Sequence, residues 1–466
     1  RSMEIDNDTV QIRPSSSLPS RSLALTVYDL FFFKIEPTSF IFYYQLPGST
    51  PENFFSAVLP KLKRSLSLVL DHFFPLAGRL VWPQNEPKPI LLYTPDDSVS
   101  LTVVKASNPE AFLAYTGADA VDASEARRLV PELHCTDTEA DPISVQVTYF
   151  CNYGVSIGLS SQHGVLDGFS AAMFWNAWAA TNSALSTVDD TPPFPPEFSP
   201  DLKRYLPEEL EGLFSEMIAW LYSPSNLRCY QSDNPRTLKC LPAPTLSPSL
   251  VRKTFEIKSN EAEMLKQIVW KELQTDEKTL RLSSFVISYA FAINCLVLAK
   301  RIDNSSFIFH VRNCRDDTNV PENYFGNCCV INRCKYEVTV ENAESNYGFA
   351  LMVKEIAGSV KDSKSMTIRD GAAVVLYGNS FGTSSQCFTV GGHPGFRFYS
   401  IDYGWGKPIR IETVSIENLG SFAIIDTRDG DGLQIQLVLE KDIMETFSSL
   451  FLQGLKMCAA QKLIEA

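Results

Sequence analysis

Histidine and basic residues are scarce in this 466-residue sequence. Five histidines are present, and 54 Asp and Glu residues outnumber 41 Lys and Arg residues, which gives a formal net charge of −13 at pH 7. A protein that binds nucleic acid or an anionic membrane normally presents a basic surface, so both kinds of partner are disfavoured. No two histidines have HxxxH or HExxH spacing and no CxxC pair occurs, so we expect no metal site.

Long hydrophobic runs are also missing. The longest apolar segment covers residues 285–299 and is interrupted by Ser288 and Asn294, whereas a helix needs about 20 apolar residues to cross a bilayer. We therefore expect this segment to be a buried helix. The first residues are polar and acidic and form no apolar leader, which argues against secretion.

The eleven cysteines are odd in number and scattered through the chain. Disulfide-stabilised proteins are usually short and secreted, with an even number of regularly spaced cysteines. We therefore expect free thiols and a cytoplasmic protein. Independently of the cysteines, we expect a monomer.

The composition is that of a chain with a substantial core. Hydrophobic residues make up 45% of the sequence, aromatic residues 11% and charged residues 20%, which is typical of globular proteins. Between the strand and helix patterns of the two ends lies a proline-rich stretch, residues 191–250, which we expect to be a crossover linker because proline interrupts both kinds of element. It would join an N-terminal domain, residues 1–190, to a C-terminal domain, residues 251–466, both of the α/β class.

Hydrophobic periodicity predicts the elements of the two domains. Val155, Ile157 and Leu159, for example, alternate with smaller residues at the period of two expected for a strand. The expected strands span residues 40–46, 89–93, 144–150, 154–160, 253–258, 306–311, 328–333, 397–402 and 433–439, and the expected helices span residues 51–74, 169–181, 208–222, 260–273, 285–299 and 442–461.

One histidine, His163, has a position that suits catalysis. It follows the strand predicted over residues 154–160 and precedes a turn that contains Gly164, Asp167 and Gly168. A neutral imidazole at such a strand end can accept a proton from a hydroxyl group near pH 7. Asp167 could alternatively serve only as the N-cap of the next helix, and an HxxxD pattern alone often arises by chance.

Two glycine-containing motifs occur in the second half of the chain. DYGWGKP, residues 402–408, predicts a tight turn that holds an indole ring, because its glycines allow positive φ. NYFGNC, residues 323–328, predicts an aromatic turn that leads into a strand. Either turn could be a purely structural corner.

A possible rival nucleophile is Ser380 in the GxSxG pattern of residues 378–382. It follows a strand-like segment, residues 374–377, but a serine-hydrolase elbow must be followed by a helix and then by Asp or Glu and His in that order. No acidic residue lies between Ser380 and His393, the last histidine. We therefore set the hydrolase interpretation aside.

HGVLDG at 163–168, YFGNC at 324–328 and DYGWGKP at 402–408 together resemble the motifs of the plant BAHD acyl-CoA-dependent acyltransferases. Residues 66–80 and 412–424 are also similar to that family, so the resemblance covers nearly the whole chain. YFGNC, with the helical segment after HGVLDG, resembles the branch that acylates sugar hydroxyls of flavonoid and other phenolic glucosides, often with malonyl-CoA.

The resemblance implies an α/β fold of two chloramphenicol-acetyltransferase-like domains, each a mixed sheet with helices, with a channel between them. It implies that His163 is the general base at mid-channel and that Asp167 braces the histidine loop. The DYGWG turn would be structural. Alternatively, the Trp405 indole N–H is a candidate donor to the oxyanion of the tetrahedral intermediate. The residues implicated in addition are Lys266, Ser284 and Arg315 as CoA contacts, and Asp402, Gly404, Trp405 and Gly406 as the structural motif.

The implied substrates are an acyl-CoA, with malonyl-CoA favoured, and a phenolic glucoside or similar plant metabolite, with no permanently bound cofactor. Two departures from the family bear on this. The family's DxRxR pattern is VRNCR here, at residues 311–315, and the helix predicted over residues 169–181 has no cation for a malonyl carboxylate. Hydroxycinnamoyl-CoA and acetyl-CoA are therefore alternative donors. A non-catalytic metabolite-binding relative is a further alternative, against which the intact His163 and Asp167 argue.

Overall fold

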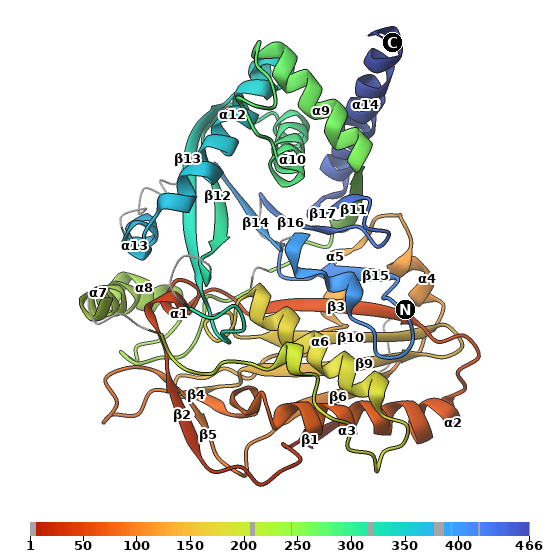
Figure 1. Cartoon of the computed structure of the whole chain (residues 1–466), viewed down its shortest axis with the longest axis vertical. Helices are drawn as coiled ribbons and strands as arrows, with labels where there is room; N and C mark the ends of the chain where they lie inside the picture. The colour runs from red at the N-terminus through yellow and green to blue at the C-terminus, as the bar shows by residue number, and fades with distance from the viewer. Residues whose placement is uncertain are drawn as a thin grey trace.

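The computed structural model describes residues 6–205, 210–243, 245–315, 320–376, 386–392, 394–417 and 420–465. Two halves, each built on a large sheet, are stacked along the long axis of the molecule (Figure 1). The two-domain α/β architecture expected from the sequence is confirmed.

The N-terminal half contains a six-stranded sheet in the order β1-β6-β9-β10-β3-β15, in which only the β6–β9 pair is parallel. Helices α3 (Leu59–Leu70) and α6 (Gly168–Ala184) pack against each other in this half. Every residue of β9 and β10 is buried, because helices and loops cover both faces. The strands are β1 (Asp6–Ile12), β3 (Thr38–Gln45), β6 (Val99–Lys105), β9 (Ile143–Phe150), β10 (Gly154–Ser161) and β15 (Arg410–Thr413).

The C-terminal half contains a seven-stranded sheet in the order β13-β12-β14-β16-β17-β11-β7. The apolar run expected to be a buried helix forms α10 (Ser284–Lys300), which packs against the three other long helices of this half, α9, α12 and α14. The strands are β7 (Val121–Asp122), β11 (Leu250–Lys258), β12 (Asn304–Asn313), β13 (Cys329–Val338), β14 (Gln386–Gly391), β16 (Ser421–Asp426) and β17 (Gly432–Glu440), and the other helices are α9 (Ser259–Glu272), α12 (Asn346–Asp362), α13 (Ile368–Leu376) and α14 (Lys441–Glu465).

A small third sheet, which the sequence did not predict as a unit, lies in the N-terminal half. Its order is β2-β5-β4-β8, and all of its neighbours are antiparallel. Of its strands, β5 matches an expected one. The bounds are β2 (Arg21–Ala24), β4 (Arg79–Val81), β5 (Ile90–Tyr93) and β8 (Glu139–Ala140).

The two halves exchange strands. β15 comes from the C-terminal part of the chain and pairs with β3, while β7 comes from the N-terminal part and pairs with β11. Figure 1 shows blue β15 beside red β3. The expected boundaries at residues 190 and 250 therefore divide the chain into two parts, and each part contributes one strand to the sheet of the other.

A buried ion-pair network fixes this exchange. Arg252 of β11 is 4% exposed, and its Nη2 donates to Glu417 Oε1 at 3.1 Å and to the Val414 carbonyl at 2.8 Å. Its Nη1 lies 3.5 Å from Oε2 of Glu412 on β15, and Glu412 also binds Arg410. These contacts tie the seven-stranded sheet to β15, the strand that the C-terminal part of the chain contributes to the six-stranded sheet.

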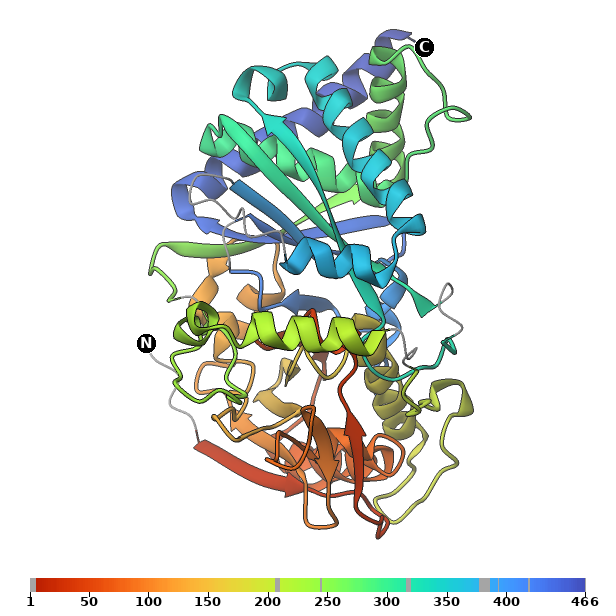
Figure 2. The same ribbon diagram turned by 90° about the vertical axis from the view of Figure 1, so that its left-hand side faces the viewer.

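The proline-rich linker contains more structure than a crossover loop. It includes α7 (Glu211–Leu221), close to the expected helix, and α8 (Pro224–Cys229). Leu213, Phe214 and Met217 of α7 are buried, and α7 packs against α1 (Val27–Leu30) from the first half and α13 from the second. Figure 2 shows this helix lying across the middle of the molecule. The linker therefore contributes to the core between the halves.

Two predicted strands are wrong. Residues 397–402 contain the 3₁₀ turn Phe398–Ser400 and an irregular segment, in which Arg397 has a φ of 50°. Residues 374–376, interpreted as a strand before the GxSxG pattern, belong to helix α13, so the hydrolase elbow also lacks its strand. Short apolar runs do not distinguish strands from helices by periodicity alone. Ser380 and His393 lie outside the described residues.

His310, in the middle of β12, gives a testable pH effect on stability. It is 4% exposed, and no described residue forms a hydrogen bond with either ring nitrogen. Burial therefore lowers the pKa of His310 to about 4. The unfolded chain binds a proton at His310 near pH 6.5, whereas the folded chain does not. The stabilisation that the neutral His310 provides is therefore fully present above pH 6.5 and is lost as the pH falls from 6.5 toward 4.

We expect the free energy of unfolding to fall by about 2 kcal/mol more in wild type than in His310→Leu between pH 7.5 and pH 5. Urea denaturation at the two pH values measures this difference. Equal pH dependence of the two proteins would contradict the assignment.

Candidate active site

His163 lies just beyond the end of β10, in a turn that needs its glycines. The Gln162 N–H donates to the Pro142 carbonyl at 2.9 Å, and the chain then turns away from the sheet. A Cβ on Gly164 would lie 2.8 Å from the Phe33 Cα, and a Cβ on Gly168 would lie 2.3 Å from the Phe396 ring. Neither distance allows a larger residue without displacement of its neighbour, so these glycines let the turn pack closely.

The imidazole of His163 stacks on Phe32. The ring centroids are 4.3 Å apart and the planes differ by 7°. Burial lowers the pKa of His163, while its own carbonyl and Asp167 act in the opposite direction. Its Nδ1 is enclosed and forms no hydrogen bond with another described residue. The ring is thus held in one orientation and kept neutral at physiological pH.

The YFGNC turn fixes the backbone of His163. Asn327 Nδ2 donates to the His163 carbonyl at 3.0 Å and to Asp29 Oδ1 at 3.0 Å. Asp29 is buried at the start of α1, where its other oxygen accepts from the Thr26 N–H at 2.7 Å. Three segments that are distant in sequence therefore converge behind the histidine. Asn327 belongs to a motif that the sequence analysis identified. No pattern in the sequence predicted that Asp29 or Phe32 belongs to the site.

Asp167 points away from the imidazole into a set of donors. It caps α6 by accepting from the Ser170 N–H at 2.9 Å, and it accepts from the Cys328 N–H at 3.0 Å. Arg315 binds both carboxylate oxygens, at 2.8 Å and 3.1 Å. Burial raises the pKa of Asp167, but Arg315 and the N–H donors outweigh it, and the pKa lies below its ordinary value. Asp167 therefore remains ionised in a buried ion pair.

Arg315 does not lie where a CoA contact was expected. It is 2% exposed, and besides Asp167 its guanidinium donates to the Ser170 hydroxyl and to the Tyr324 and Gly326 carbonyls. These bonds occupy its donors inside the protein, so we replace the CoA assignment with a bracing one. The single arginine left from the DxRxR pattern thus joins the HxxxD turn to the YFGNC turn.

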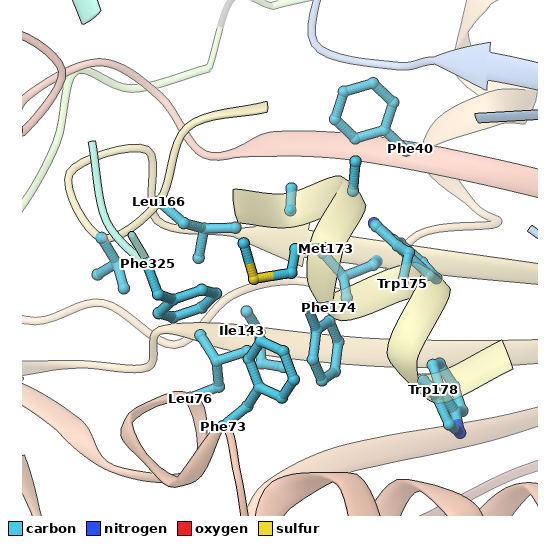
Figure 3. Close-up of a cluster of buried hydrophobic side chains, with 14 of the residues drawn as sticks. Phe40, Phe73, Leu76, Ile143, Leu166, Met173, Phe174, Trp175, Trp178 and Phe325 are labelled. Atoms are coloured by element: carbon cyan, nitrogen blue, oxygen red, sulfur yellow. The ribbon is translucent and has the colours of Figure 1, made fainter. Parts of the chain in front are cut away.

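A buried apolar cluster supports these two turns from below (Figure 3). Leu166 of the histidine turn and Phe325 of the YFGNC turn face Met173 and Phe174 of α6. Phe325 also packs edge-on against Phe73, with ring centroids 5.2 Å apart. The turn that carries His163 is therefore anchored by hydrophobic packing as well as by ion pairs.

The DYGWG segment is a closed turn at the other end of α6. Oδ1 of Asp402 accepts from the backbone N–H groups of Gly404, Trp405 and Gly406 at 2.7, 3.0 and 2.9 Å. The two glycines have φ of +93° and +87°, which favour glycine. Tyr403 and Trp405 stack on each other and both pack on Tyr44 of β3. This geometry is what a structural turn requires.

The length of α6 separates this turn from His163. Asn182 near the C-terminus of α6 donates to the Tyr403 carbonyl at 2.7 Å, whereas Asp167 caps the N-terminus. At 1.5 Å per residue, Asp167 and Asn182 are roughly 20 Å apart along the helix. This separation argues against Trp405 as the oxyanion donor, and its structural role stays a proposal.

The two other expected CoA contacts lie in the C-terminal half. Ser284 is the first residue of α10, directly after the N-cap Ser283. Lys266 is on α9 and is partly buried, with its Nζ 3.5 Å from Glu263. The helices α9 and α10 that carry these two residues are in contact. Both residues remain proposed CoA contacts.

The described part of the chain contains no group of three His, Cys, Asp or Glu side chains that could hold a metal ion. Within the same part, no helix is both long and apolar enough to cross a membrane.

Comparison with known proteins agrees with this architecture. A family model described as the Transferase family matches residues 3–453. A malonyl-CoA:anthocyanidin 5-O-glucoside-6''-O-malonyltransferase from Arabidopsis thaliana is 33% identical, with 96% of this chain and 98% of that protein aligned. Phenolic glucoside malonyltransferase 1 from the same plant is 32% identical, over 96% and 97%. An Arabidopsis agmatine coumaroyltransferase is 33% identical, over 94% and 96%.

Among solved structures, vinorine synthase superposes with a TM-score of 0.66 at 21% identity, with 96% of each chain covered. The family model, the relatives aligned over nearly their full length and the fold all indicate the same family. The chain belongs to the Transferase family of BAHD acyltransferases and is an acyl-CoA-dependent acyltransferase.

Proposed function

We propose that the protein transfers an acyl group, with malonyl favoured, from CoA to a sugar hydroxyl of a phenolic or flavonoid glucoside, with His163 as the general base. The catalytic part is supported by the imidazole of His163, which stacks on Phe32 and has its pKa lowered by burial, and by the backbone of the same residue, which Asn327 of the YFGNC turn holds. The substrate part is supported by the named activities of relatives in the malonyltransferase branch.

In this proposal, His163 uses Nε2, because Nδ1 is enclosed. Nε2 takes the proton of the acceptor hydroxyl as its oxygen attacks the thioester carbonyl, and the imidazolium then gives a proton to the departing CoA thiolate. The stacked Phe32 ring favours the transient imidazolium, since a cation over an aromatic face is attracted by the ring electrons. Asp167 and Arg315 hold the turn and exchange no proton with the substrate.

A hydroxycinnamoyl donor is the second candidate, and three observations favour it. Helix α6 contains no Lys or Arg that could bind a malonyl carboxylate. The guanidinium of Arg315 is already paired with Asp167. One relative of similar identity is named as a coumaroyltransferase. Acetyl-CoA is a third donor to be tested with these.

A donor and acceptor panel tests the proposal. We expect kcat/KM with malonyl-CoA and a phenolic glucoside to exceed that with coumaroyl-CoA or acetyl-CoA by about tenfold or more, a difference of about 1.4 kcal/mol in the transition state. Thiol release measures turnover, and mass spectrometry of the product locates the acyl group. The same aglycone without its sugar is the matched control.

Preference for coumaroyl-CoA would replace the malonyl assignment and leave His163 as the base. Acylation of the aglycone at the rate of the glucoside would contradict the sugar-hydroxyl assignment.

A further inference from the structure

Two cysteine thiols lie together beside the histidine turn. Cys135 lies just before β8, and Cys240 lies in the linker segment. The amide Nε2 of Gln162 is 3.6 Å from the Cys135 sulfur and 3.3 Å from the Cys240 sulfur. Both sulfurs also approach the Leu238 carbonyl oxygen, at 3.2 Å and 4.0 Å. The two thiols therefore share one donor and one acceptor, and they also form a hydrogen bond with each other.

The surroundings of this pair favour a reactive thiolate at Cys240. A hydrogen bond with Cys135 lowers the pKa of Cys240 to about 7; burial opposes this, whereas Gln162 and the Lys34 ammonium assist it. Lys34 is held in place by the Thr237 and Lys239 carbonyls at 2.6 Å and 2.9 Å. Asp137 also acts on Lys34, and it bonds mainly to Ser232 and Thr237 and pairs with the Lys239 ammonium at 3.2 Å. Thiolates, not thiols, react with peroxides.

Both cysteine residues are partly exposed to solvent. They belong to segments 105 residues apart in sequence, one in the first half and one in the linker. A bond between them would therefore join two segments that are otherwise held by packing and hydrogen bonds.

We propose that Cys135 and Cys240 form an oxidation site at which hydrogen peroxide produces a reversible intramolecular disulfide. The Cys240 thiolate attacks one peroxide oxygen, the O–O bond breaks, and the sulfur becomes a sulfenic acid while hydroxide leaves and takes up a proton to form water. The Cys135 sulfur then attacks the Cys240 sulfur, the S–S bond forms, and the S–O bond breaks with release of a second water. Two thiols are oxidised and one hydrogen peroxide is reduced to two waters.

This disulfide would act on the catalytic turn through Gln162. That residue immediately precedes His163, and its side chain bonds to both sulfurs in the reduced protein. Oxidation removes the thiol donor of Cys240 and pulls the linker toward β8. We expect kcat to fall by about tenfold, because displacement of catalytic groups by a fraction of an ångström is costly.

The test uses the full chain, reduced and then freed of reductant. After treatment with equimolar hydrogen peroxide and alkylation, peptides are mapped by mass spectrometry without reduction. We expect a cross-link between the peptides that contain Cys135 and Cys240, loss of two titratable thiols, and recovery of both thiols and turnover with dithiothreitol. Cys135→Ser and Cys240→Ser should each abolish the cross-link, whereas Cys229→Ser, which alters an exposed cysteine, should not.

A Cys240 sulfinic acid with no cross-link, or a cross-link in Cys240→Ser, would overturn the proposal. A mapped disulfide with unchanged turnover would overturn its action on the site. The mapping needs no assay of acyl transfer, so it succeeds or fails independently of the proposed function on which the turnover measurement rests. Melting temperatures of the reduced variants confirm that each serine variant is folded.

Discussion

Replacement of His163 with alanine is expected to lower kcat by about 10²–10⁴-fold, the usual contribution of general-base catalysis. KM for the acyl-CoA should change little, because the imidazole acts on the acceptor hydroxyl. The melting temperature should stay within a few degrees of wild type, since the ion pair and hydrogen bonds that hold the turn use Asp167, Arg315 and the His163 backbone. Steady-state thiol release and thermal unfolding measure the two effects.

His134→Ala is the matched control for this variant. His134 lies in a loop with its side chain 53% exposed, and its Nε2 is 3.5 Å from Glu139. Its removal should leave turnover unchanged. A His163→Ala protein that keeps half of the wild-type kcat would exclude the general-base role.

Replacement of Arg315 with methionine is expected to cause the largest loss of stability, about 3–5 kcal/mol, because it leaves the Asp167 carboxylate buried and unpaired. Asp167→Asn should also lower both stability and activity, because the amide cannot pair with the guanidinium and leaves that cation uncompensated. His163→Ala, in contrast, should lower activity alone. Chemical denaturation of the three variants separates these outcomes.

The double variant Asp167→Asn with Arg315→Met is the internal control. It removes both charges, so we expect it to be more stable than Arg315→Met alone. It should still be less stable than wild type, because an amide has one acceptor oxygen and cannot accept from both the Ser170 and the Cys328 N–H groups. Lys258→Met breaks an exposed pair with Asp429 and should cost no more than about 1 kcal/mol. A loss from Arg315→Met as small as that from Lys258→Met would contradict the bracing role.

The elements that the sequence predicted best are those with strong local patterns. Strands β9 and β10, with their alternating apolar residues, and helix α10, with its long apolar run, begin within one residue of their expected starts. The strand-end position of His163 and the capping role of Asp167 followed from the same local signals. Local periodicity and capping chemistry determine such features, so one sequence is enough to predict them.

The features that were missed depend on partners far away in the chain. β15 has only four residues and becomes a strand because it pairs with β3, more than 350 residues earlier. Arg315 binds Asp167 across 148 residues, and nothing next to Arg315 in sequence distinguishes a buried ion pair from a phosphate contact. Phe32 shows no motif, and its stacking on His163 follows only from the docking of α1 beside the turn.

The pH dependence of kcat/KM tests the central claim, a neutral His163 that removes the acceptor proton, most directly. Burial lowers the pKa of His163 below its ordinary value of 6.5, so the imidazole is already deprotonated at pH 7. The account predicts that kcat/KM is constant between pH 7 and 8 and falls only below pH 6.5, with this acidic limb absent from the residual activity of His163→Ala. A rise in kcat/KM with a midpoint above pH 7, or the same acidic limb in His163→Ala, would contradict it.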